Sequence, residues 1–162
     1  KDVDGKEVKL ADYKGKVVLL EWSNSECPVC ARHAKGKTAE KTLAGFKDKG
    51  VVWINVDSNA GSETKIDGIK KFCKDNGLTA AWLLDPSGAT GKAYGAKTTP
   101  HMFVIDKDGK LAYMGAIDDD KDGNKGDKAK NYVKDAIDAV LKGSTGATST
   151  TEPYGCIVKY KG

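Results

Sequence analysis

Residues 17–30 read VVLLEWSNSECPVC, and this stretch decides the fold. Its first six residues form an apolar run broken only by Glu21, which is typical of a strand covered on both faces. A Cys-Pro-Val-Cys sequence follows at residues 27–30, and Pro28 suits the first turn of a helix, where no backbone N–H is needed. We therefore predict that Cys27 lies at the junction between a buried strand and a helix.

Two cysteines three residues apart at a helix N-terminus form a chemically special pair. The free N–H groups and the dipole of the helix end favour a thiolate on Cys27, whereas an ordinary thiol is only about 3% ionised at neutral pH. Cys30, one turn later, can attack a mixed disulfide on Cys27 and release the substrate. The pattern favours a redox centre with Cys27 as nucleophile and Cys30 as resolving thiol.

Two other interpretations of the pair stay open. A zinc site needs about four ligands; a second ligand pair at suitable spacing is absent, although His33 follows Cys30 by three residues. A structural disulfide or two inert thiols would also fit the spacing. We predict no metal site and no cofactor.

The rest of the chain alternates strand and helix patterns. Predicted strands cover residues 6–10, 17–22, 51–56, 81–84, 102–105 and 111–114; predicted helices cover residues 28–49 with a break at Gly36, 62–75, a short segment ending at Gly95, and 127–142. An Asp-Lys-Asp-Gly turn joins the last two strands as a hairpin. The early β-α-β order implies parallel pairing. We expect an α/β fold, a mixed central sheet with helices on both faces.

We predict one domain at residues 1–142. Residues 143–153 are rich in Gly, Ser and Thr and read as a flexible connector. The last piece, residues 156–160, either adds a strand or lies on the surface. We expect residues 143–162 to pack on the same domain.

Composition excludes several function classes. The 162 residues carry a formal charge of +4, almost all of the basic residues are lysines interleaved with acids, and Arg32 is the only arginine. A nucleic-acid binder would cluster basic and aromatic residues, so we predict no nucleic-acid partner. No run approaches the roughly 18 apolar residues of a membrane span. The chain starts at Lys1 without a leader, which we interpret as trimming or processing, and we favour export to the periplasm or the exterior over the cytoplasm. The oligomeric state stays open.

Residues 22–30 (WSNSECPVC) together with residues 98–106 (TTPHMFVID) resemble the thioredoxin superfamily. More narrowly, the chain is similar to the redoxin branch of AhpC/TSA-like and thiol–disulfide-oxidoreductase-like proteins, from Lys1 to about Leu141. The resemblance implies a thioredoxin-like fold and a thiol–disulfide oxidoreductase acting on protein or small-molecule thiols and disulfides. The end of the chain, residues 155–160, resembles the tail of a peroxiredoxin-like subgroup.

The resemblance also implies roles for residues around the dithiol. It places Pro100 after a cis peptide bond and against the two cysteines, with the backbone of Thr99 available to hydrogen-bond a substrate chain. Glu21 matches a buried acid position and would take the proton of Cys30; the alternative is a strand-end carboxylate turned to water. Spacing alone would equally allow Pro100 to be an ordinary strand-edge proline.

Two alternative functions follow from the same residues. A peroxiredoxin-like peroxidase needs Thr or Ser three residues before its cysteine and an arginine nearby; here that position is Asn24, and Arg32 is the single arginine available. A Sco-like copper-binding protein would use Cys27, Cys30 and a histidine. His101 could tune the thiolate or bind copper, or it could be a strand histidine with a backbone partner.

The two remaining cysteines have open roles. Cys73 falls on the inner side of a predicted helix, where a small buried thiol is the default. Cys156 has three readings: a Cys73–Cys156 disulfide in an oxidising compartment, a resolving thiol for Cys27, and a free terminal cysteine. The distance between the Cα atoms decides among them, since a separation above about 7 Å cannot be bridged without movement.

Overall fold

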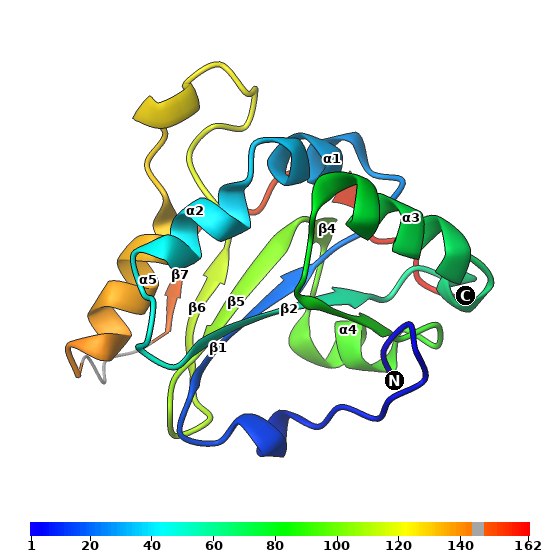
Figure 1. Ribbon diagram of the computed structural model, residues 1–162, viewed down its shortest axis with the longest axis horizontal. Helices are drawn as coiled ribbons and strands as arrows, with labels where there is room; N and C mark the ends of the chain where they lie inside the picture. Colours follow the sequence, from blue (N-terminus) through cyan, green and yellow to red (C-terminus); the bar gives the residue numbers. More distant parts are fainter. Residues whose placement is uncertain (144–147) are drawn as a thin grey trace.

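A mixed six-stranded sheet forms the centre of the protein (Figure 1). The computed structural model describes residues 1–143 and 148–162. The strand order is β3-β2-β1-β5-β6-β7, with β1 (Val17–Trp22), β2 (Val51–Asp57), β3 (Ala81–Leu84), β5 (His101–Ile105), β6 (Leu111–Gly115) and β7 (Ser149–Thr150). Strands β1, β2 and β3 pair in parallel, whereas β5 runs antiparallel to both β1 and β6. The predicted mixed sheet and hairpin are confirmed.

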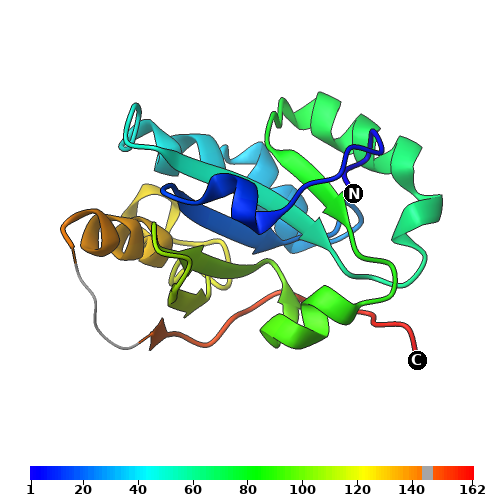
Figure 2. The same cartoon turned by 90° about the horizontal axis from the view of Figure 1, so that it is seen from below.

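Helices cover both faces of the sheet, as predicted (Figure 2). They are α1 (Pro28–Lys35), α2 (Thr38–Ala44), α3 (Ile66–Asn76), α4 (Ala89–Tyr94) and α5 (Tyr132–Leu141). Because side chains alternate along β1, Leu19 packs on one face with Ile137 of α5, and Leu20 packs on the other with Tyr94 of α4. β1 is buried along its whole length. The apolar run at residues 17–22 therefore contributes side chains to the hydrophobic cores on both faces of the sheet.

Two predicted helices have different bounds in the structure. The helix predicted over residues 28–49 breaks at Gly36, as expected, but its second half ends at Ala44, where Gly45 forms the C-cap and Asp48 takes a left-handed φ of 63°. The helix predicted over 127–142 begins only at Tyr132, because Asn131 caps it by accepting a hydrogen bond from the Lys134 N–H. The 3-10 helix Gly126–Lys128 precedes that cap.

The strand predicted at residues 6–10 is wrong. The edge of β3 is taken instead by the first residues of the chain: Asp2 bridges Leu83, and the Val3 N–H donates to the Trp82 carbonyl at 3.1 Å. The chain then enters the 3-10 helix Leu10–Tyr13. Of the two apolar residues in the alternating stretch, Val8 is partly buried and Leu10 is 41% exposed, so the stretch has no buried face.

The C-terminal segment is more ordered than the predicted connector. Part of that connector, residues 144–147, lies outside the described residues, but Ser149–Thr150 forms β7, parallel to β6. Farther on, β8 (Cys156–Ile157) pairs antiparallel with β4 (Thr98–Thr99) in a small second sheet. The end of the chain therefore lies against the loop that precedes β5.

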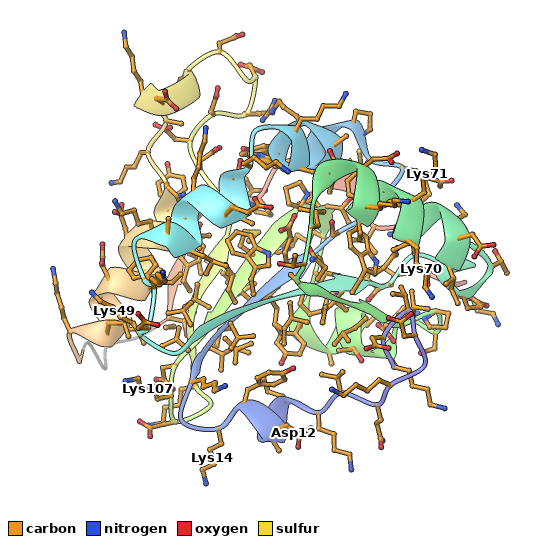
Figure 3. All side chains as sticks on the ribbon, viewed as in Figure 1. Asp12, Lys14, Lys49, Lys70, Lys71 and Lys107 are labelled. Atoms are coloured by element: carbon orange, nitrogen blue, oxygen red, sulfur yellow. The ribbon has the colours of Figure 1, made fainter. Side chains whose placement is uncertain are left out.

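Charge is spread around the molecule. Lys14, Lys49, Lys70, Lys71 and Lys107 are all exposed and lie at separate points of the periphery (Figure 3). This distribution is that of solvated side chains. In the part of the chain that the structure describes, no helix has the length and apolarity needed to cross a bilayer.

Close packing at Gly115 generates a stability prediction. A Cβ there would lie 2.8 Å from the Thr151 backbone nitrogen, and the φ of 151° disfavours any side chain. Gly115→Ala should lower the free energy of unfolding by about 1–3 kcal/mol, measured by urea denaturation. Gly68→Ala is the matched control, because nothing lies within 4 Å of a Cβ at that helical position. Equal stability of the two variants would contradict this packing argument.

Candidate active site

The two cysteines of the Cys-Pro-Val-Cys motif lie at the first turn of α1. Cys27 is the N-cap of the helix, Pro28 occupies its first turn, and Cys30 follows inside it. β1 delivers the chain to this point, and the Cys27 N–H donates to the Asn24 carbonyl at 3.0 Å. Cys27 is 2% exposed and Cys30 3% exposed. The predicted junction of strand and helix is confirmed, and both sulfurs lie beneath the surface.

The loop before β5 lies directly against the nucleophile. The Thr99–Pro100 peptide bond is cis, as the resemblance implied. The thiol of Cys27 donates to the Thr99 carbonyl at 3.1 Å, and Thr99 is 1% exposed. Residues about 70 positions apart in the chain therefore form one site, because β1 and β5 are neighbours in the sheet.

Hydrogen bonding shifts the pKa values of the two cysteine thiols in opposite directions. The thiol of Cys30 hydrogen-bonds the sulfur of Cys27, and this contact lowers the pKa of Cys27 far below its ordinary value; burial opposes the shift, and a hydrogen bond from Cys156 adds to it. The same contact, with burial and the nearby Glu21, raises the pKa of Cys30. These shifts mean that Cys27 loses its proton before Cys30 does, and that the hydrogen bond it donates to the Thr99 carbonyl is given up when it ionises.

Glu21 is a buried acid behind the dithiol. It is 8% exposed, and Trp53 Nε1 donates to its Oε2 at 2.9 Å. Burial raises its pKa to about 7, against an ordinary value of 4.5. A cavity of about 60 Å³ borders Glu21, Cys30 and Trp53, large enough for a water molecule between the groups. Of the two readings of Glu21, the buried carboxyl is confirmed.

The histidines have protein partners of their own. His33 hydrogen-bonds Thr38 Oγ1 at 3.1 Å and the Tyr154 hydroxyl at 3.0 Å. His101 Nδ1 accepts from the Lys97 N–H, and burial lowers the pKa of His101 to about 4. The reading of His101 as a strand histidine with a backbone partner is confirmed. Within residues 1–143 and 148–162, no three His, Cys, Asp or Glu side chains are grouped to hold a metal ion.

Arg32 is engaged by the loop at residues 120–121. Its guanidinium donates to the Asp120 carbonyl at 2.8 Å and to the Lys121 carbonyl at 3.2 Å. Asn24, at the position where a peroxidase needs Thr or Ser, accepts from the Glu26 N–H at 2.9 Å. The two groups that would hold a peroxide are engaged in supporting the loops around α1.

Cys156, for which three readings were open, lies at the active site next to Thr99 and is not paired with Cys73. All four cysteines are free thiols. Cys156 lies in β8 beside Thr99, and its thiol hydrogen-bonds Cys27, which together with burial raises the pKa of Cys156. Cys73 lies on α3, and burial alone raises its pKa. Pairing of β8 with β4 carries Cys156 to the active site instead.

Two site residues were missed in the sequence analysis. Trp53 holds Glu21 from the adjacent strand, and Tyr154 joins α1 to the C-terminal segment by hydrogen-bonding both His33 and Asp118. The parallel pairing of β1 with β2 could have indicated Trp53, because it sets Trp53 opposite Leu19, two residues before Glu21 on the same face of the strand. Tyr154 follows the connector at residues 143–153, and the sequence beyond that connector does not indicate which part of the domain it contacts.

Comparison with known proteins agrees with this geometry. The sequence profile described as Redoxin matches residues 1–133. The chain belongs to the Redoxin family. A relative named thiol-disulfide oxidoreductase ResA, from Bacillus thuringiensis subsp. konkukian (strain 97-27), is 34% identical over 110 residues, 68% of this chain and 60% of the relative. This redoxin domain thus spans about 60% of the length of the curated relatives it matches.

Solved structures share the fold. A hypothetical protein of Sinorhizobium meliloti 1021 superposes with a TM-score of 0.81 at 31% identity, covering 99% of this redoxin and 88% of that chain. The thioredoxin domain of a thiol-disulfide oxidoreductase of Bacteroides vulgatus gives 0.56 at 26% identity, covering 68% and 76%. The predicted thioredoxin-like fold is confirmed.

The pKa of Glu21 generates a pH prediction. Because the folded carboxyl keeps its proton up to a pKa of about 7, the folded state binds more protons than the unfolded state above pH 4.5. Stability from this group is present below pH 4.5 and falls by roughly 3 kcal/mol as pH rises through 7. Denaturant unfolding should show this slope in the wild type and lose it in Glu21→Gln. Parallel profiles would contradict the buried-acid assignment.

Proposed function

We propose that this redoxin is a thiol–disulfide oxidoreductase that exchanges electrons through Cys27 and Cys30. The contact that carries the proposal is the hydrogen bond from Cys30 to the sulfur of Cys27 at the N-terminus of α1. It separates a thiolate nucleophile from a protonated partner one turn away. The relatives named thiol-disulfide oxidoreductase support the same chemistry.

The reaction proceeds in two exchanges. The Cys27 thiolate attacks one sulfur of a substrate disulfide, forms a mixed disulfide and expels the other half as a thiolate. Cys30 then loses its proton and attacks Cys27, which releases the second half of the substrate and leaves a Cys27–Cys30 disulfide. Glu21, across the small cavity from Cys30, accepts that proton. Two protein thiols are oxidised for each disulfide reduced, and the reverse sequence oxidises a substrate dithiol.

Substrates in this proposal are disulfides or thiols of proteins and small molecules, and the setting is extracytoplasmic. Disulfides persist in such compartments, so an exchange enzyme has targets there. A peroxidase function has no support from Arg32 or Asn24, since both are engaged elsewhere. A copper carrier lacks a histidine grouped with the two cysteines among the described residues.

Replacing each cysteine separates the two exchange steps. Cys27→Ser should abolish catalysed reduction of oxidised glutathione by dithiothreitol, measured above the rate without protein, since the nucleophile is lost. Cys30→Ser should still react at Cys27 but stop with Cys27 held in a disulfide that Cys30 can no longer resolve, identified by mass spectrometry of the Cys27 peptide. Cys73→Ser serves as the control and should keep wild-type turnover. Full activity of Cys27→Ser would overturn the proposed function.

A further inference from the structure

The C-terminal strand occupies the place beside the nucleophile that a substrate chain would need. β8 pairs antiparallel with β4, with Cys156 opposite Thr99 and Ile157 opposite Thr98. The Thr99 carbonyl is the group that accepts from Cys27. The backbone edge of β4 is thus paired with β8 of the same chain. Cys156 occupies the position at which the reacting residue of a strand-like substrate would lie.

Contacts on both sides hold this strand in register. Before it, the Tyr154 hydroxyl bonds Asp118 and His33. After it, the Val158 N–H donates to the Lys97 carbonyl at 3.0 Å, and the Tyr160 hydroxyl donates to the Ala96 carbonyl at 2.6 Å. The position of Cys156 is therefore fixed by several separate hydrogen bonds.

The three cysteines at the active site differ sharply in solvent exposure. Cys27 and Cys30 are 2% and 3% exposed, whereas Cys156 is only partly buried. An external disulfide therefore meets Cys156 before it meets the dithiol. Cys156 lies opposite Thr99, whose carbonyl is 3.1 Å from the Cys27 sulfur, so the two cysteines are neighbours.

We propose that Cys156 is a third redox-active cysteine, which carries electrons between the buried dithiol and external disulfides through a Cys27–Cys156 disulfide. The proposal rests on the proposed function, because it requires a reactive Cys27. It also names the substrate class as low-molecular-weight disulfides and thiols, because β8 fills the edge on which an extended polypeptide would pair.

Each step balances. Cys156, as thiolate, attacks a small disulfide RSSR and forms Cys156–SR, releasing RS⁻. The Cys27 thiolate attacks the Cys156 sulfur, forms the Cys27–Cys156 disulfide and releases a second RS⁻. Cys30, losing its proton, attacks Cys27, forms Cys27–Cys30 and returns Cys156 as a thiolate. Overall, RSSR takes two electrons from the two thiols of Cys27 and Cys30.

Gly155 is what lets the strand approach so closely. A Cβ at this position would collide with the Thr99 carbonyl, and its φ is +140°. Gly155→Ala should therefore separate Cys156 from Cys27 while keeping all four cysteines in the chain.

Trapping the intermediate tests the proposal. Reduced Cys30→Ser treated with oxidised glutathione should accumulate an intramolecular Cys27–Cys156 disulfide, identified by mass spectrometry of non-reduced peptides. Cys30→Ser with Gly155→Ala should give a lower yield of that link and more glutathione adduct. Only glutathione adducts, or only dimers linked between chains, in folded Cys30→Ser would overturn the proposal.

A second test measures the rate of disulfide formation in a variant that keeps both Cys27 and Cys30. Cys156→Ser, which keeps Cys27 and Cys30, should form the Cys27–Cys30 disulfide from oxidised glutathione about tenfold more slowly than the wild type. An unchanged rate would overturn the role of Cys156 and leave the proposed function standing. A wild type that never forms Cys27–Cys30 would overturn the proposed function itself, so the two failures are distinguishable.

Discussion

Stabilisation of a negative charge on the sulfur of Cys27 is the constraint on which the rest of the site depends. The N-terminus of α1 and the thiol of Cys30 hold this charge, and burial works against it. A buried charge is costly unless hydrogen bonds compensate. Hydrogen bonds from Cys156 and from the Thr99 side chain further lower the pKa of Cys27. Each of these segments reaches the sulfur only because β1, β5 and β4 come together at one end of the sheet.

The second constraint is where the proton goes. Glu21 shares a small cavity with Cys30, and burial leaves its pKa near neutral. An acid with that pKa accepts and returns a proton at physiological pH, which an exposed glutamate does poorly. Trp53 fixes its orientation from the next strand. The low pKa of one cysteine and the high pKa of the other therefore belong to one buried network that includes this carboxyl.

Short-range sequence patterns predicted most of this site. The remaining parts depend on pairing between distant segments, which those patterns do not determine. The apolar run of β1, Pro28 at the helix start and the break at Gly36 act within a few residues, so the strand–dithiol–helix unit was readable. The false strand at residues 6–10 and the undecided position of Cys156 share another cause. Which segment takes the edge of β3 or of β4 depends on competition between distant parts of the chain, which local pattern does not encode.

The account stands most directly on the ionisation of Cys27. The pH dependence of its alkylation by iodoacetamide, followed at the Cys27 peptide by mass spectrometry, reports that ionisation because only the thiolate reacts. The account predicts a midpoint well below the ordinary thiol value of about 8.5, and an upward shift of that midpoint in Cys30→Ser. A midpoint near 8.5 in the wild type, unmoved by the substitution, would contradict it.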